Sequence, residues 1–291
     1  MLWIFLTLAA APLQVARNAM QRGLVGEAGP WGATLVRFLF GLPFSLAIFG
    51  VVAFLTPGAA PHGSPWFWTW ASVGATSQVL GMAALLAAMQ RCGFGVATVL
   101  QLSALPVGAL IGWLAFGDAL SVVAWAGVAL ASVSLALVSW PWRAEPSFTG
   151  SALGLAAGLG FAMAFNSYRQ ATMALEPEHP IYAAALTVLT VQVVQSVALT
   201  AVLVVCRPQA LRAVAGAWRS SLAAGFFGSA SSVCWFAALA LAPVGPVRAL
   251  ATIEAPIAAA VGRRLWRERP SLRQWIGGAL ATVGVAMTAL G

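Results

Sequence analysis

Residues 251–256 read Ala-Thr-Ile-Glu-Ala-Pro and lie in the middle of an apolar span that covers residues 244–266. Glu254 is about halfway along this span, and Pro256 follows two positions later. A carboxylate is costly in lipid, and a proline inside a helix leaves a backbone carbonyl without its usual partner. The pattern therefore predicts that Glu254 is a functional residue within a membrane. The alternative is a structural ion pair between Glu254 and an arginine, such as Arg37 or Arg17.

The composition of the whole chain indicates an integral membrane protein. Of its 291 residues, 61% are hydrophobic and 8% are charged, and the mean hydropathy is +0.90. A soluble protein of this length needs a more polar exterior. The first apolar segment, 2–20, is long enough to span and lacks a basic leader, so a cleavable signal peptide is not expected. The net charge of +8 is then interpreted relative to the membrane and does not indicate a nucleic-acid partner.

Ten apolar segments are long enough to cross a bilayer. Their connections are too short to hold a soluble domain, so the function is expected within the membrane bundle. The expected limits are 2–21, 30–55, 66–90, 93–117, 121–141, 149–174, 181–206, 218–241, 244–266 and 271–290.

The two halves of the sequence repeat each other. A shift of 150 residues places Pro106 on Pro256 and Asp118 on Glu268. One repeat holds five spans, and this odd number makes the second copy enter the membrane upside down. Inverted repeats are typical of secondary transporters, whose substrate site lies near the midplane between the copies. We therefore expect a first repeat at 1–145 (helices 1–5) and a second, inverted repeat at 146–291 (helices 6–10).

Three stretches resemble a known family. The stretch Ala104-Leu-Pro-Val-Gly-Ala-Leu-Ile-Gly-Trp-Leu-Ala-Phe-Gly-Asp118 is similar to the repeat of the drug/metabolite transporter superfamily, EamA type, and so is Glu254-Ala-Pro-Ile-Ala-Ala-Ala-Val-Gly262. Leu35-Val-Arg-Phe-Leu39 is similar to the second-helix signature of that family. The resemblance implies an all-α integral membrane protein in which ten transmembrane helices form two inverted-topology five-helix repeats around a central cavity. It also implies small substrates such as amino acids, drugs or nucleotide sugars.

Polar residues at mid-depth in the spans are the candidate substrate site. Arg17 and Arg37 either snorkel toward the surface or offer donors to a substrate carboxylate or phosphate. The carboxamides either bind substrate or form hydrogen bonds between helices, and Trp235 either stacks on a substrate or packs. The predicted substrate-binding residues are Gln14, Arg17, Asn18, Arg37, Gln78, Gln101, Asn166, Gln192, Trp235 and Glu254.

Prolines and peripheral arginines are candidates for moving parts. A proline near a helix centre removes a hydrogen bond and is a plausible hinge for rocking one repeat against the other. The predicted hinge and gating residues are Pro12, Pro43, Pro106, Pro256, Arg169 and Arg248. For Arg169 and Arg248, anchoring and substrate contact are the alternative roles. Gly154 and Gly158 are four residues apart, which predicts close helix packing.

No motif for an enzyme, a cofactor or a metal site is present in the sequence. His62 and His179 lie in expected loops without cysteine or carboxylate neighbours at ligand spacing. We find no glycine-rich phosphate loop and no serine nucleophile motif. The expectation is a chain without catalytic residues, cofactor or metal, in contact with membrane lipids as a monomer or a homodimer.

Arginine placement predicts the orientation. Eleven of the fifteen arginines follow the odd-numbered helices. The positive-inside rule places these arginine-rich loops in the cytoplasm and both termini outside, in what we expect to be a bacterial inner membrane.

The function predicted from these features is secondary active transport. The expected substrates are amino acids or similar small amphoteric metabolites, moved outward by alternating access, with Glu254 as a residue that couples transport to protons. Two alternatives remain open: a carrier of organic cations that uses Glu254 and Trp235, and a membrane receptor or scaffold that moves no solute.

Overall fold

The computed structural model describes residues 1–101, 103–139, 148–254, 257, 276–277, 279–280, 283–284 and 286–288, and every ordered element in these ranges is helical. The expected spans at 244–266 and 271–290 are therefore described only in part, and Pro256 lies outside the described residues. Asn18 is helical, but its side chain is not among those described. The elements are α1 Leu2–Leu39, α2 Leu42–Leu55, α3 Pro65–Gln101, α4 Ala104–Phe116, α5 Val122–Ser139, α6 Phe148–Leu175, α7 Pro180–Cys206, α8 Pro208–Gly216, α9 Trp218–Leu241 and α10 Val244–Leu250, followed by a 3₁₀ turn at Ala251–Ile253.

Several of these helices are suited to a lipid bilayer. Within the described residues, four segments are long and apolar enough to cross a membrane: Thr34–Leu55, Phe148–Leu175, Pro180–Cys206 and Ser221–Leu241. Four shorter apolar helices accompany them: Leu2–Arg17, Ala104–Phe116, Val122–Ser134 and Val244–Ile253. The chain is therefore an all-helical, multi-pass membrane protein.

The distribution of side chains agrees with a lipid environment. Large apolar residues lie on the outside, including Phe54 at 84% exposure and Val205 at 82%. The interior contains polar residues such as Asn166, Gln192 and Gln195. A surface of this kind is costly in water and favourable in lipid, whereas interior polar groups need partners inside the bundle.

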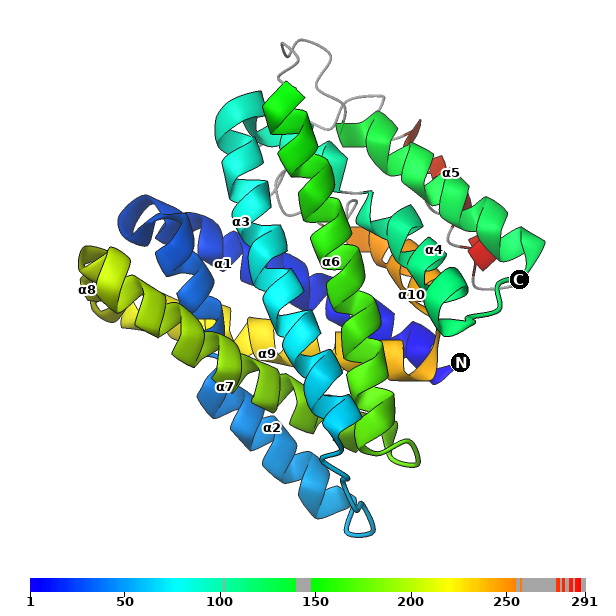
Figure 1. Cartoon of the computed structure of the whole chain (residues 1–291), viewed down its shortest axis with the longest axis horizontal. Helices are drawn as coiled ribbons and strands as arrows, with labels where there is room; N and C mark the ends of the chain where they lie inside the picture. The colour runs from blue at the N-terminus through cyan, green and yellow to red at the C-terminus, as the bar shows by residue number, and fades with distance from the viewer. Residues whose placement is uncertain are drawn as a thin grey trace.

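The first two long helices turn back on themselves. A straight helix with the 38 residues of α1 would be about 57 Å long, roughly twice the thickness of the hydrocarbon core. Figure 1 shows α1 and α3 bending within their length. The expected loops at 26–30 and 91–93 are therefore not helix ends, because the backbone stays helical through both.

The helix breaks come instead just before two of the predicted hinge prolines. The break between α1 and α2 precedes Pro43, and the break between α3 and α4 precedes Pro106. Proline has no N–H, so the carbonyl four residues earlier has no helical donor, which favours a break at this point. Pro12, in contrast, lies inside α1 without ending it, and its side chain is exposed.

Small residues let α3 and α6 lie against each other along much of their length (Figure 1). A Cβ atom on Gly160 would lie 2.9 Å from the Cα of Gly81. A Cβ atom on Gly154 would lie 2.7 Å from the Cβ of Leu100, and one on Gly158 would overlap Ser103. The pair Gly154 and Gly158 thus has the packing role that its spacing predicts.

Candidate functional site

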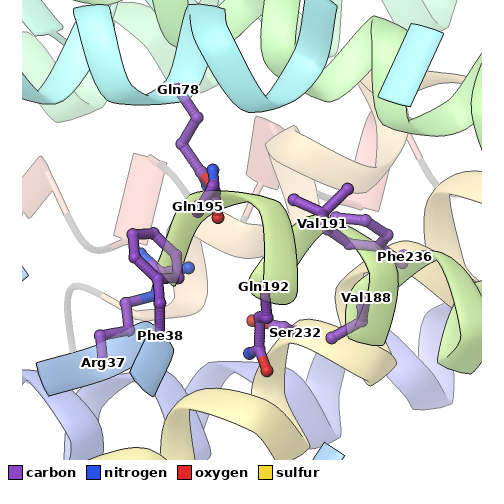
Figure 2. Close-up of a pocket in the computed structure, with 9 residues that line it drawn as sticks. All are labelled: Arg37, Phe38, Gln78, Val188, Val191, Gln192, Gln195, Ser232 and Phe236. Atoms are coloured by element: carbon purple, nitrogen blue, oxygen red, sulfur yellow. The ribbon is translucent and has the colours of Figure 1, made fainter. Parts of the chain in front are cut away.

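A small cavity lies where α1, α3, α7 and α9 meet (Figure 2). Its volume is about 10 Å³, which is room for one water molecule. A larger ligand therefore fits only if the helices move apart. The lining residues are Arg37, Phe38, Gln78, Val188, Val191, Gln192, Gln195, Ser232 and Phe236.

Two polar residues of the cavity lining, Gln78 and Gln195, form a hydrogen-bond network with Tyr168, which lies behind the lining. Gln78 on α3 and Gln195 on α7 reach toward each other (Figure 2), and Gln195 Nε2 donates to Gln78 Oε1 at 2.7 Å. Tyr168 on α6 donates its hydroxyl to the same oxygen at 2.9 Å, and its ring stacks on Phe236 with centroids 4.4 Å apart. This network links α3, α6 and α7, so a ligand that competes for one member affects all three helices.

A second network connects the cavity to the break between α1 and α2. Ser45 donates to Gln192 Oε1 at 2.5 Å, and Gln192 Nε2 donates to Ser229 Oγ at 3.3 Å. Ser229 in turn donates to the carbonyl of Gly41 at 2.9 Å, within the break. Gln192 therefore lies between the cavity and the interrupted part of the second apolar span.

Two atoms of the lining residues keep free hydrogen-bonding capacity. Arg37 Nε, a donor, and Gln195 Oε1, an acceptor, are buried and have no hydrogen-bond partner in the described part of the chain. The Arg37 guanidinium also lies 5.2 Å from the centre of the Phe38 ring. The site thus combines a positive donor, a neutral acceptor and an aromatic surface.

Glu254 belongs to a neighbouring cluster and is not among the residues that line the cavity. Gln14 Nε2 donates to both Glu254 oxygens, at 3.2 and 3.1 Å, and Trp235 Nε1 donates to Gln14 Oε1 at 3.1 Å. Arg248 exerts an electrostatic attraction on Glu254. Its guanidinium lies 5.0 Å from the Trp235 ring and 4.6 Å from the Phe165 ring.

Arg17 connects this cluster to the cavity. It is 6% exposed, attracted by Glu254 and repelled by Arg37. A Cβ atom on Gly228 would lie 3.3 Å from Arg17 Cδ and 3.6 Å from Arg37 Cγ, so the two arginine stems run over the same glycine of α9. The charges of Arg37, Arg17 and Glu254 therefore influence one another across the interior.

Asn166 and Arg169 lie in a different part of the bundle, on α6. Asn166 Nδ2 donates to the carbonyls of Gly108 and Ala162, both at 3.0 Å. Arg169 Nη1 donates to the carbonyls of Leu239 and Ala242 at 2.7 and 2.9 Å, where α9 ends. Arg169 Nη2 forms an ion pair with Asp118 at 3.2 Å.

The predicted substrate residues thus divide into groups. The cavity contains Arg37, Gln78 and Gln192, whereas Gln14, Arg17, Trp235 and Glu254 form the adjacent cluster. Asn166 donates one interhelical hydrogen bond, to Gly108, which is the kind of contact given as its alternative role. Gln101 is not a lining residue, and the side chain of Asn18 is not described.

Some lining residues were missed by the prediction. Gln195 and Ser232 carry the same signal as the residues chosen, since both are polar side chains at mid-depth. Tyr168 does not line the cavity but donates to Gln78, which does; it is one of only two tyrosines and lies two residues after Asn166, which is a weaker signal. Phe38, Val188, Val191 and Phe236 cannot be told from packing residues by sequence. Within the described ranges, no group of three or more His, Cys, Asp or Glu side chains is placed to hold a metal ion.

Comparisons with known proteins point to one family. Residues 148–290 match the EamA-like transporter family. Twenty-eight solved chains match in structure, and one of them, from a crystal structure, has a TM-score of 0.72 at 15% sequence identity, over 99% of this chain and 96% of its own length. That similarity shows the fold alone. No curated protein matches in sequence.

Proposed function

Because this chain belongs to the EamA-like transporter family, within the drug/metabolite transporter superfamily, we propose that it is a secondary active transporter of small metabolites. In this proposal ten transmembrane helices form two inverted repeats, 1–145 and 146–291, that rock around a central site. The small cavity between α1, α3, α7 and α9 is a contracted form of that site.

The observation that carries the proposal is the pair of unsatisfied groups at the cavity. Arg37 Nε is a charged donor without a partner among the described atoms, and Gln195 Oε1 is an acceptor in the same position. A carboxylate is the natural ligand of a guanidinium, and an ammonium group is a suitable donor for a carboxamide oxygen. A small molecule with both groups, such as an amino acid, satisfies both sides, and we propose such amphoteric metabolites as the exported substrates.

Glu254 is proposed as the residue that couples transport to protons. Glu254 attracts Arg17, and Arg17 is in turn repelled by Arg37, which lines the cavity. When Glu254 takes up a proton, Arg17 loses an attractive partner. Arg17 then competes more strongly with Arg37 for the anionic group of a substrate. Proton uptake and substrate binding are thereby linked through electrostatics rather than through direct contact.

Organic cations are the weaker alternative. The Trp235 face that would receive a cation already lies 5.0 Å from the Arg248 guanidinium. Three arginines, Arg17, Arg37 and Arg248, lie in the cavity and the neighbouring Glu254 cluster. Among the described residues, Glu254 is the only carboxylate with an electrostatic effect on these arginines. This charge balance favours a ligand that brings a negative group.

Flux and binding in the purified protein test the proposal. In proteoliposomes with an imposed pH gradient, we expect flux of some amino acids, and we expect Arg37→Gln to reduce both substrate binding and flux at least tenfold. Glu254→Gln keeps the acceptor for Gln14 and is expected to retain binding but to lose the pH-driven part of the flux. Stabilisation by hydrophobic cations but not by amino acids would favour the alternative substrate class.

Two outcomes would refute parts of the proposal. Wild-type protein that moves none of a broad set of metabolites would support the receptor or scaffold interpretation. Unchanged pH-driven flux in Glu254→Gln would end the coupling role of Glu254. As a control, Gln101→Ala removes a polar side chain that does not line the cavity and is expected to transport normally.

A further inference from the structure

Two buried oxygen atoms face the same space beside α4, and neither has a hydrogen-bond donor among the described residues. They are Asp118 Oδ2 and Asn166 Oδ1. A Cβ atom on Gly112 would lie 2.7 Å from the first and 3.3 Å from the second. Asn166 is completely buried, and the Asp118 side chain is 9% exposed. Two facing acceptors repel each other unless something positive lies between them.

The orientation of the Asn166 amide is determined by its other hydrogen bonds. Its Nδ2 atom donates to the carbonyl oxygens of Gly108 and Ala162, both at 3.0 Å. Turning the amide over would set its oxygen against these two carbonyls and lose both bonds. Asn166 Oδ1 therefore points toward Asp118.

The carboxylate of Asp118 has one oxygen engaged and one free. Arg169 Nη2 lies 3.2 Å from Oδ1, which leaves Oδ2 directed to the space shared with Asn166. Charged groups on the surrounding helices are few. On α6, the charged side chain in contact with Asp118 is Arg169. Helices α4 and α5 carry no charged residue. Arg248 of α10 faces Phe165 and Trp235 instead.

The end of α4 supplies further negative potential. Gly117 ends the helix with φ of +69°, a conformation that glycine adopts without strain. The N–H of Asp118 then returns to the carbonyl of Gly112 at 3.0 Å. The carboxyl end of a helix carries a partial negative charge and exposes carbonyl oxygens, and ends of interrupted helices hold coupling cations in other transporter folds.

We propose that Asp118 Oδ2, Asn166 Oδ1 and the carboxyl end of α4 bind a small monovalent cation, a sodium ion. The sodium ion is coordinated by both oxygens together with carbonyls at the end of α4. The site is separate from the cavity and does not depend on which substrate is carried.

Occupancy of this site is coupled to the contact between α6 and α9. Asp118 shares Arg169 with the carbonyls of Leu239 and Ala242. A cation at Oδ2 competes with Arg169 for the charge of the carboxylate. The ion pair weakens, and the hydrogen bonds from Arg169 to the carbonyls at the end of α9 become stronger. The cation thereby influences how α4, α6 and α9 are held at this end of the bundle.

Thermal unfolding of the purified full-length protein in detergent tests the site without requiring transport. The melting temperature is compared in sodium chloride and in N-methylglucamine chloride, both at pH 8. We expect sodium to raise the melting temperature of the wild type. Asp118→Asn and Asn166→Ala are each expected to weaken the apparent affinity for that cation at least tenfold. Asn166→Ala leaves the Asp118–Arg169 ion pair in place, so it separates the cation site from the ion pair.

Matched controls complete the test. Glu178→Gln removes an exposed acid and Ser167→Ala removes a buried hydroxyl next to Asn166, and both are expected to respond as the wild type does. A response to sodium that is the same in Asp118→Asn, Asn166→Ala and the wild type would overturn the proposal and leave only a bridging water. A response lost in Asp118→Asn but kept in Asn166→Ala would also overturn it. Cation binding without any solute flux would refute the proposed transport and leave this site standing.

Discussion

Glu176 joins two loops that are far apart in the sequence. Its Oε2 accepts the N–H of Ala60 at 2.8 Å, and its Oε1 lies 3.5 Å from Nδ1 of His179. The N–H of His62 donates to the carbonyl of Leu175 at 2.9 Å beside it. Desolvation raises the pKa of the Glu176 carboxyl, but the hydrogen bonds from Ala60, His179 and Glu178 and the charge of His179 outweigh it and hold the pKa below 4.5.

This contact makes stability depend on pH. A carboxyl with a lowered pKa stabilises the fold above its unfolded-state pKa, near 4.5, and this stabilisation is lost as the pH falls through the folded-state value. We expect Glu176→Gln to have a lower melting temperature than the wild type at pH 7, with a difference that narrows as the pH falls below 4.5. Thermal unfolding followed by tryptophan fluorescence measures it. Glu178→Gln serves as the control, and a difference that stays constant from pH 7 to pH 4 would contradict the assignment.

Single residues also show how far the sequence alone can predict the site. Depth in an apolar span identified Arg37, Gln78 and Gln192, which line the cavity, and Glu254, which does not. Depth is set by position along the helix, which is visible in the sequence. Whether a side chain meets the cavity depends on the rotation of its helix, and this rotation is set by packing against neighbours.

At the scale of elements, α9 packs directly on the break between α1 and α2. A Cβ atom on Gly225 would overlap the carbonyl oxygen of Phe40 and would lie 2.9 Å from the nitrogen of Gly41. Such distances are closer than any real Cβ contact, and backbone atoms cannot turn away as a flexible side chain can. Glycine at this position lets the backbones meet and keeps Ser229 within reach of Gly41.

A methyl group at this crossing is expected to be destabilising. Gly225→Ala should lower the free energy of unfolding by about 1–3 kcal/mol, the usual cost of overpacking, as measured by denaturant or thermal unfolding in detergent. Gly50→Ala on α2 is the matched control, because its Cβ would have no atom within 4 Å. Its effect is expected to be within about 0.5 kcal/mol. Equal effects of the two substitutions would show that helix propensity, and not the crossing, determines the outcome.

At the scale of the whole molecule, the orientation in the membrane is a prediction that the native cysteines can test. Cys206 is exposed at the end of α7, directly before Arg207 in one of the arginine-rich loops. In a variant with Cys92→Ala and Cys234→Ala, an impermeant maleimide is expected to label Cys206 in inside-out vesicles and not in intact spheroplasts. The control variant also carries Cys206→Ser and has Gly58→Cys in the exposed loop at 56–64 as its labelling site. This cysteine is expected to be labelled in intact spheroplasts and not in inside-out vesicles. Labelling of Cys206 from outside would reverse the predicted orientation.

The sequence by itself determined the class of the protein. Its composition requires a lipid environment, its apolar segments have membrane-spanning lengths, and its motifs point to the family that residues 148–290 match. These properties follow from the number and order of apolar residues, which do not depend on how the helices are arranged.

Only the tertiary structure decided which polar residues meet. It brought Gln78, Tyr168 and Gln195 together, placed Glu254 beside Gln14, and set Asn166 against Asp118. It also moved the helix breaks to the residues before Pro43 and Pro106. The physical reason is that small residues such as Gly160 and Gly225 allow many helix rotations, and the sum of close contacts across the bundle selects one of them.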